Sequence, residues 1–199
     1  MGRKNLADER KPEVYQACWS LFCREGFDNT TFSKIAKEMN VSAGLLTHYF
    51  GTKVDLFIET ISFIYDRFLM EAYFDNPEVQ SFQDPLDKLF YFSESLVSTK
   101  MDQFFPDIAY YGSIYMGLRN EKINKTLANL TDKLHQIFTA LLEEHFQKFP
   151  NKIKDTHAIA SLILFLLDGL DLHHVIAPDR FDRKENFKAI KKAIELIIA

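Results

Sequence analysis

Residues 31–53 read TFSKIAKEMNVSAGLLTHYFGTK, and this stretch decides the fold. Thr31 and Ser42 are suited to cap helices, because a hydroxyl oxygen accepts hydrogen bonds from the orphan N–H groups of a first turn. Asn40 stands between them, where a tight turn between helices needs a residue that tolerates positive φ. The stretch therefore predicts a helix-turn-helix. Apolar residues at helical spacing would form its shared core, namely Ile35, Ala36, Met39, Val41, Leu46 and Phe50.

The second predicted helix turns small or hydrogen-bonding side chains away from that core, which suits a surface pressed against DNA. Gly44 allows a close backbone approach, and Leu45 can meet the methyl group of a thymine. Thr47 and His48 can reach base edges or phosphates. Lys53 adds charge that favours phosphate contact through counterion release. The residues that we expect to bind DNA are Thr31, Ser42, Ala43, Gly44, Leu45, Thr47, His48, Tyr49 and Lys53.

This stretch resembles the N-terminal motif of TetR-family transcriptional repressors. Residues 21–31 (LFCREGFDNTT) are similar to the end of the family's first helix, and residues 46–50 (LTHYF) to the branch that contains betaine-synthesis repressors. Thr47 and Ala43 stand where the family often has Tyr and Lys, which indicates a different phosphate or base contact. The motif covers about the first quarter of the chain. The family pattern T-x-x-x-IA-x-x-x-x-VS-x-G-x-x-x-x-YF-x-x-K-x-x-L is met by Thr31, Ile35, Ala36, Val41, Ser42, Gly44, Tyr49, Phe50, Lys53 and Leu56.

The resemblance implies an all-α protein with a three-helix DNA-binding domain at residues 1–53 and a helical ligand-binding and dimerisation domain at residues 54–199. It also implies a regulator, most commonly a repressor, that binds a palindromic operator as a dimer and is released by a small molecule. The helix beginning near Thr52 joins the two domains. A ligand that pushes this helix would change the spacing of the two recognition helices and release DNA.

Two other classes of function stay open. One is a helical protein–protein interaction module that uses the same fold for a different purpose. The other is an enzyme, which the sequence favours least. The chain has only seven Gly, and it contains neither a Gly-rich phosphate loop nor a nucleophile elbow.

Apolar periodicity and helix breakers predict about nine helices and no strand. Pro12 is expected in the first turn of the first helix, and Gly26 at its end. Residues 1–9 are expected to form a polar arm that frays, and residues 75–85 (DNPEVQSFQDP) a loop. Besides the helix-turn-helix, the predicted helices span roughly residues 10–25, 52–73, 86–98, 106–120, 121–148, 154–176 and 183–198.

The last two predicted helices are expected to form a homodimer interface. The helix at residues 154–176 is apolar all round, so we expect it to be buried on more than one side. In proteins resembling this one, the last two helices pair with their copies. Two recognition helices related by a two-fold axis can then read a palindrome. We therefore expect an isologous homodimer through residues 154–199, with an intrachain core as the alternative.

Aromatic residues gather in the middle of the chain, and several of them are Tyr, which requires a polar partner when it is buried. Ligand pockets are mostly apolar with a few polar groups, so we expect a cavity between the middle helices, with an ordinary aromatic core as the alternative. Asp168 facing this cavity would favour a cationic or hydrogen-bond-donating ligand. The expected ligand-binding residues are Phe68, Tyr91, Phe104, Tyr110, Tyr111, Tyr115, Phe138, Phe165, Asp168 and His173.

Neither a metal nor a cofactor is expected. Cys18 and Cys23 lie about 140° apart around one predicted helix, which is too far for a shared metal or a disulfide. Asp171 and His174 share a helical face but have no second pair of ligands at a diagnostic spacing.

The charge pattern agrees weakly with nucleic-acid binding. Residues 1–53 carry eight Lys or Arg and six Asp or Glu, so a mildly positive head precedes an acidic remainder in a chain of net charge −4. No signal peptide precedes the first helix, and the longest apolar run is about half a membrane span. We therefore expect a cytoplasmic protein without a membrane segment.

Overall fold

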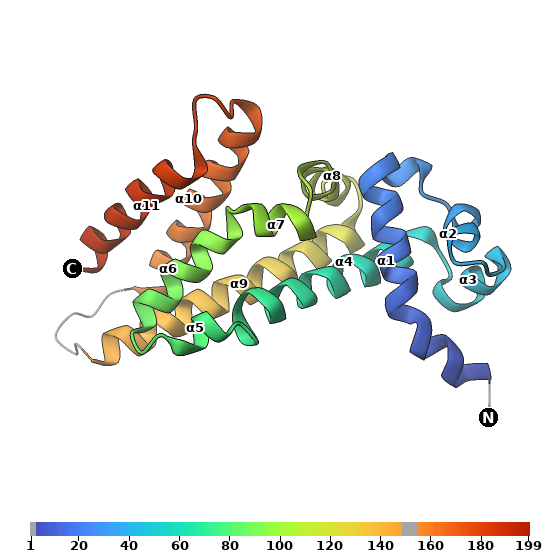
Figure 1. The fold of residues 1–199 in the computed structure, drawn as a ribbon, viewed down its shortest axis with the longest axis horizontal. Coiled ribbons are helices and arrows are strands. Elements are labelled where there is room, and N and C mark those ends of the chain that lie inside the picture. Colours follow the sequence, from blue (N-terminus) through green and yellow to red (C-terminus); the bar gives the residue numbers. More distant parts are fainter. Residues whose placement is uncertain (1–2, 149–154) are drawn as a thin grey trace. The chain divides into compact units, whose positions relative to one another are not determined.

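The computed structural model describes residues 3–148 and 155–199, and this part of the chain is built of helices without any strand (Figure 1). The all-α class expected from the sequence is confirmed. In chain order the elements are α1 (Arg3–Asn29), α2 (Phe32–Glu38), α3 (Ala43–Phe50), α4 (Lys53–Leu69), the π-helical segment η1 (Met70–Phe74), α5 (Pro77–Ser81), α6 (Pro85–Leu96), α7 (Thr99–Phe104), α8 (Asp107–Gly117), α9 (Glu121–Gln147), α10 (Thr156–Ile176) and α11 (Arg183–Ile198).

Close packing divides these helices into two compact units. The first unit contains the residues up to Phe68 together with Phe104–Leu130, so it holds α1–α3, nearly all of α4, α8 and the start of α9. The second unit contains Leu69–Gln103 and Thr131–Ala199. The functional boundary expected between residues 53 and 54 falls in the first turn of α4 and stays a prediction.

The first helix begins earlier than expected. The backbone of residues 3–9 is helical, so the expected frayed arm is wrong there, while residues 1 and 2 lie outside the described part. The reason is local, because Arg, Lys, Leu, Ala and Glu are good helix formers and neither Gly nor Pro stands between residues 3 and 11. Pro12 consequently lies inside the helix. Gly26, with a φ of 76°, interrupts the helix where its end was predicted, since a residue without Cβ adopts this conformation at little cost.

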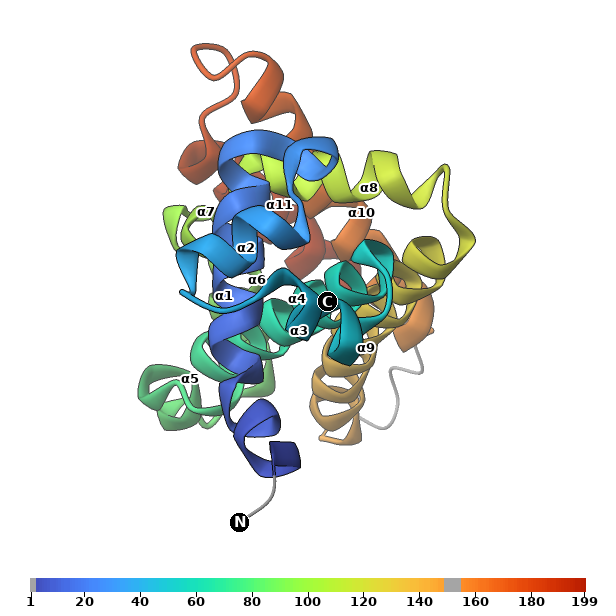
Figure 2. The ribbon, with the colours of Figure 1, turned by 90° about the vertical axis from the view of Figure 1, so that its right-hand side faces the viewer.

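The predicted helix-turn-helix is formed by α2 and α3 (Figure 2). Thr31 Oγ1 accepts a hydrogen bond from the backbone N–H of Lys34 at 3.3 Å, and Ser42 Oγ accepts one from Leu45 at 3.3 Å. Asn40 adopts a φ of 54° in the turn. Both caps and the positive φ are therefore confirmed, and they define the entry to each helix as the sequence indicates.

The expected core of this motif is also present. Ile35, Ala36, Leu46 and Phe50 are buried, and the other two expected core residues, Met39 and Val41, are partly buried and pack against them. α1 and α4 complete the cluster, because two helices as short as α2 and α3 cannot bury an apolar face by themselves. Their contributions are Val14, Tyr15, Cys18, Leu21 and Leu56.

Short elements appear where the sequence did not predict them. α4 stops at Leu69 and continues as η1, in which the N–H of Asp75 donates to the carbonyl of Met70, five residues back, at 2.7 Å. α5 lies within the expected loop, so that expectation is wrong for residues 77–81. Pro also favours the first turn of a helix, and the side chain of Asn76 accepts two backbone hydrogen bonds as a cap. α7 is a further unpredicted helix.

The long C-terminal helices agree with the predicted ones in position. The expected break at residues 149–151 and the expected helix start at Lys154 lie outside the described residues. Of the helices that the structure describes, α10 alone has the length and apolar composition that a membrane crossing requires, with a mean hydropathy of 1.7 in its most apolar window, 33% of which is buried.

The second unit combines an apolar core with one mostly buried ion-pair network. Phe92 and Phe138 are fully buried, with ring centroids 5.8 Å apart. Arg183, at the start of α11, donates to Asp102 Oδ2 on α7 at 2.7 Å and to Asp171 Oδ1 on α10 at 2.6 Å. One guanidinium therefore joins three helices of this unit.

Replacing Arg183 by Met is expected to lower the free energy of unfolding by about 2–4 kcal/mol, because two carboxylates lose their shared partner in a mostly buried site. Urea unfolding measures the change. Lys188→Met on the same helix is the control, since Lys188 and its partner Glu185 are exposed, and it should leave the free energy of unfolding nearly unchanged. Equal losses in the two variants would contradict the role of Arg183.

Candidate nucleic-acid interface

The outer side of α3 carries most of the expected DNA-binding residues. The residues of the motif that are exposed on this side are Ser42, Gly44, Leu45, Thr47 and His48. The inward-facing residues of the helix lie in the core. A Cβ added at Gly44 would meet no atom within 4 Å, so packing inside the chain does not require a glycine there. An open backbone on a helix surface is what close approach to another molecule requires.

The polar groups on this surface have defined partners. The hydroxyl of Thr47 donates to the carbonyl of Ala43 at 3.1 Å, which leaves its oxygen as an acceptor on the outside. The exposed imidazole of His48 lies edge-on to the ring of Tyr49, with centroids 5.3 Å apart. Tyr49 is half-buried and packs against the core, so it supports His48 as well as reaching the surface.

Lys53 has a structural contact that the sequence did not predict. Its ammonium group donates to the carbonyl of Phe27 at 2.8 Å and to that of Asp28 at 3.3 Å, and it lies 4.2 Å from the centroid of the Phe27 ring. These carbonyls follow the interruption of α1 at Gly26. That glycine was the sequence signal from which free carbonyls at this place could have been inferred. The ammonium thus ties the first turn of α4 to the end of α1, with one of its three donors still available.

Two other basic side chains near the motif are paired with carboxylates. Arg24 pairs with Glu38, and Lys34 pairs with Glu25 at 2.5 Å, so both ion pairs join the end of α1 to α2. These side chains are exposed or half-buried, so each pair contributes at most about 1 kcal/mol. Lys37 is exposed on α2. The sequence reasoning did not include these residues, whose pairing depends on how α1 and α2 pack.

The side chain of Thr52 caps the first turn of α4. Thr52 Oγ1 donates to Asp55 Oδ2 at 2.6 Å, and it accepts from the N–H of Asp55 at 3.1 Å. Lys122 of α9 donates to Asp55 Oδ1 at 3.1 Å. The Thr52 hydrogen bond, followed by Lys122, lowers the pKa of Asp55 below its usual value. The start of α4 therefore carries a fixed negative charge beside Lys53.

The expected ligand-binding residues fall in both compact units. In the first unit, the rings of Phe68 and Phe104 lie 5.5 Å apart, and those of Tyr110 and Tyr111 lie 5.1 Å apart. Tyr115 is exposed on α8. The structure thus brings these residues together in pairs within one unit.

In the second unit, Phe138 is part of the core, and the hydroxyl of Tyr91 donates to Glu78 Oε2 at 2.7 Å. Phe165, Asp168 and His173 lie on exposed positions of α10. The assignment of all ten residues to one ligand cavity stays a prediction.

The sequence reasoning missed one buried hydroxyl of the second unit. Ser93 Oγ on α6 is fully buried and has no hydrogen-bond partner among the described residues. A buried hydroxyl without a partner costs free energy, so such a group is a candidate to face a ligand. No sequence signal distinguishes Ser93 from the neighbouring Ser95, whose hydroxyl donates to the carbonyl of Phe92 at 2.6 Å.

The two residues of α10 weighed as metal ligands, Asp171 and His174, have other partners. Asp171 pairs with Arg183, and His174 Nδ1 lies 2.8 Å from the carbonyl of Phe181. Within the part of the chain that the structure describes, no group of three His, Cys, Asp or Glu side chains is placed to hold a metal ion.

A capped helix-turn-helix with an outward polar side on its second helix defines the class of helix-turn-helix DNA-binding proteins. Comparison with protein families gives two matches. Residues 15–60 match the model described as bacterial regulatory proteins, tetR family, and residues 84–197 match the tetracyclin repressor-like C-terminal domain. The second match alone covers more than half of the chain. The chain belongs to the TetR family, and it is a DNA-binding transcriptional regulator.

Individual relatives agree with this assignment. The regulator HbdR of Aromatoleum sp. (strain CIB) is 31% identical over 84 residues, which is 42% of this chain and 35% of that protein, so the match spans about a third of the relative's length. The regulator BetI of Burkholderia ambifaria is 25% identical over 203 residues, covering 100% of this chain and 99% of BetI.

The fold also has counterparts among solved structures. One is a putative transcriptional regulator from Saccharomonospora viridis in complex with choline, with a TM-score of 0.73 and 17% identity. The similarity covers 94% of this chain and 96% of that one. At this level of identity, the similarity establishes the shared fold.

Proposed function

We propose that this protein is a ligand-responsive repressor that binds a palindromic operator as a homodimer and is released by a small apolar or cationic molecule. The observation that carries the proposal is the outer side of α3, where an acceptor, an imidazole and an open glycine backbone lie together on one capped helix. Major-groove recognition needs hydrogen-bonding tips and small residues in this arrangement.

The expected residues divide into two roles. Leu45, Thr47 and His48 are proposed to face base edges, with Leu45 against a thymine methyl group. Four of the other expected residues are proposed to position the helix-turn-helix on the DNA phosphates. Lys53 supports this division, because two of its donors hold α1 and the third is available for a phosphate oxygen. The positioning residues are Thr31, Ser42, Tyr49 and Lys53, and Ala43 and Gly44 allow close approach of the backbone.

A homodimer through α10 and α11 is supported by an exposed apolar stripe. Phe165 is 70% exposed and Ile176 is 69% exposed, although the opposite side of α10 is buried within the second unit. α11 adds Leu196 and Ile197, which are also exposed. Exposed large apolar side chains on adjacent helices are typical of a subunit interface. The proposed interface spans residues 155–199, and Lys154 of the expected range lies outside the described residues.

The ligand class rests on two observations. The aromatic residues of the expected set favour an apolar or cationic ligand, since the face of an aromatic ring attracts cations. The regulator from S. viridis with the same fold was crystallised with choline, a quaternary ammonium compound. We therefore propose a small cation or a neutral molecule of similar shape as the effector.

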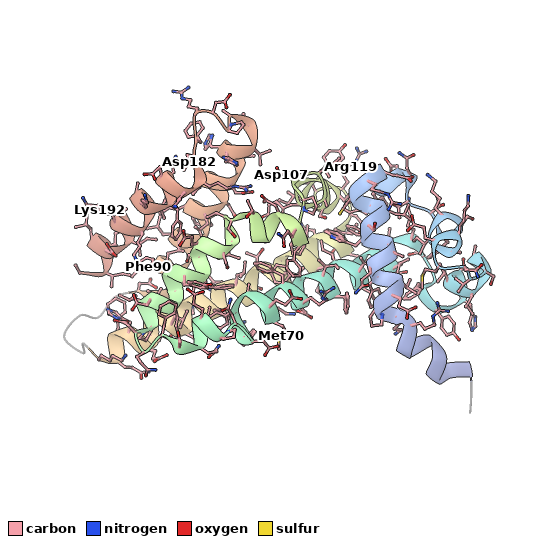
Figure 3. All side chains as sticks on the ribbon, viewed as in Figure 1. Met70, Phe90, Asp107, Arg119, Asp182 and Lys192 are labelled. Carbon is pink, nitrogen blue, oxygen red and sulfur yellow. The ribbon has the colours of Figure 1, made fainter. Side chains whose placement is uncertain are left out.

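His48→Ala is expected to weaken binding to an operator selected from random DNA by about 5- to 150-fold, because one base-edge contact is lost. Binding of the wild type should fall steeply with salt, and His48→Ala should keep the same salt slope. Fluorescence anisotropy with selected and unrelated DNA measures both. Lys148→Ala is the control, because Lys148 is exposed just after α9, outside both the helix-turn-helix and the proposed dimer interface (Figure 3 shows the side chains of α9). Unchanged sequence preference in His48→Ala would contradict the role of α3.

Phe165→Glu is expected to convert the dimer into a folded monomer, because a charge would enter the apolar interface while the residue packs little within its own chain. Sedimentation velocity at micromolar concentration measures the mass, and circular dichroism confirms the fold. Met70→Glu, an exposed apolar residue of η1 in the same unit, should stay dimeric. A wild-type monomer, or a dimeric Phe165→Glu, would contradict the interface.

Choline is expected to release the selected operator, whereas 3,3-dimethylbutanol, its neutral isostere, should act only if apolar contact suffices. The same anisotropy assay measures release by each compound. Asp168→Asn should weaken the response to choline and leave the response to the neutral compound unchanged. Failure of both compounds at saturating concentration would contradict the proposed ligand class without affecting the DNA-binding proposal.

A further inference from the structure

Two ion pairs connect the end of α1 to α2 within the first compact unit (Figure 2). Lys34 Nζ lies 2.5 Å from Glu25 Oε2, and Arg24 Nη2 pairs with Glu38 Oε1. In the first pair the cation belongs to α2, and in the second it belongs to α1. All four side chains are between about a third and a half exposed, so water reaches both pairs. The proposed function uses neither pair.

Both pairs stand at the part of the motif that meets the phosphate backbone. In a helix-turn-helix complex, the first helix of the motif crosses the DNA backbone while the second enters the major groove. Ile35 and Ala36 fill the core, so the exposed Lys34 belongs to the outer side of α2. The N–H of Lys34 donates to Thr31 Oγ1, which places Lys34 one turn from a proposed phosphate contact. Glu38 ends the same helix, before the turn that leads to α3.

Lys37 shows the other kind of cation on this helix. It is exposed in the last turn of α2 and has no carboxylate partner among residues 3–148 and 155–199. An open cation attracts any polyanion, whereas a contact pair is nearly neutral at distances beyond the Debye length of about 8–10 Å. The two pairs therefore remove two positive charges from the field that unrelated DNA meets.

The pairs are weak enough to exchange partners. An exposed ion pair is screened by water and salt, and both groups stay hydrated when it opens. A phosphate oxygen offers the released cation an equivalent partner and sets a counterion free. The two arrangements are therefore close in free energy, and the position of the nearest phosphate decides between them. A site that α3 reads in register holds the phosphates in fixed places relative to α2, whereas unrelated DNA does not.

We propose that Glu25 and Glu38 are specificity-determining residues, which keep Lys34 and Arg24 from binding the phosphates of unrelated DNA. On the operator, the fixed phosphates take both cations from their carboxylates, so the two pairs open only in the specific complex. This inference rests on the DNA binding of the proposed function and adds to it a discrimination against wrong sites. The carboxylates act through their cations and contact neither bases nor phosphates.

Removing one carboxylate tests this mechanism. Glu25→Gln frees Lys34 for any DNA, so binding to unrelated DNA should strengthen about fivefold at about 150 mM salt. The slope of log affinity against log salt should steepen by about 0.9, which is the change for one phosphate contact. The slope for the selected operator should stay unchanged, because the pair is already open there. Glu38→Gln should act in the same way through Arg24. Fluorescence anisotropy with the operator and with an unrelated duplex of equal length measures both slopes.

The cations provide a second arm. Lys34→Gln should reduce the slope for the operator by about 0.9 and leave the slope for unrelated DNA unchanged, because Lys34 contacts no phosphate there. Lys37→Gln, which removes an open cation of the same helix, should reduce the slope for both DNAs. The double variant Glu25→Gln, Lys34→Gln should lose the gain of Glu25→Gln. That loss would show that the carboxylate acts through its partner and not through net charge.

Glu143→Gln is the control for net charge, because it removes an exposed carboxylate of α9 in the second unit and should change neither slope. Urea unfolding of each variant shows that the fold is intact. Three outcomes would overturn the inference: unchanged slopes for unrelated DNA in both carboxylate variants, equal steepening on both DNAs, or a gain that persists in the double variant. A wild type without salt-dependent binding would overturn the proposed function as well. Steep binding by the wild type with unchanged carboxylate variants would overturn this inference alone.

Discussion

The recognition helix depends on one shared apolar core. α2 has seven residues and α3 has eight, and helices of this length are not stable in water by themselves. Burial of Ile35, Leu46 and Phe50 against α1 and α4 contributes about 1.5–3 kcal/mol for each side chain, which compensates for that weakness. The same burial determines which side of α3 faces outward, so the position of the proposed DNA-binding surface follows from the core.

The start of α4 is joined to α1 by two separate polar contacts. Lys53 donates to the carbonyls at the end of α1, and the hydroxyl of Tyr15 donates to Glu59 Oε2 at 2.6 Å. α3 lies between these helices in the sequence and packs against both. A movement of α4 would therefore also move α1. We expect α1, α3 and α4 to move as one body if a ligand displaces α4.

Features set by neighbouring residues were predictable from the sequence. The caps at Thr31 and Ser42, the positive φ of Asn40 and the interruption at Gly26 each follow from the chemistry of one or two residues. Other features depend on which segments meet in space. The hydrogen bonds of Lys53, the network around Arg183 and the burial of the Ser93 hydroxyl without a partner among the described residues have no signature in a single stretch of sequence. For the same reason, the expected ligand set could not be reduced to residues that share one cavity.

The π-helical turn at η1 constrains how many residues the chain can have at the end of α4. A turn closed across five residues holds one residue more than an α-helical turn, so η1 behaves as a one-residue insertion at the end of α4. Deleting one residue there would restore the α-helical register and rotate the remaining residues of η1 by about 100° relative to α4. Ala72, which is buried, would then leave its place. Changes in chain length at this point are therefore equivalent to rotations of a helical face.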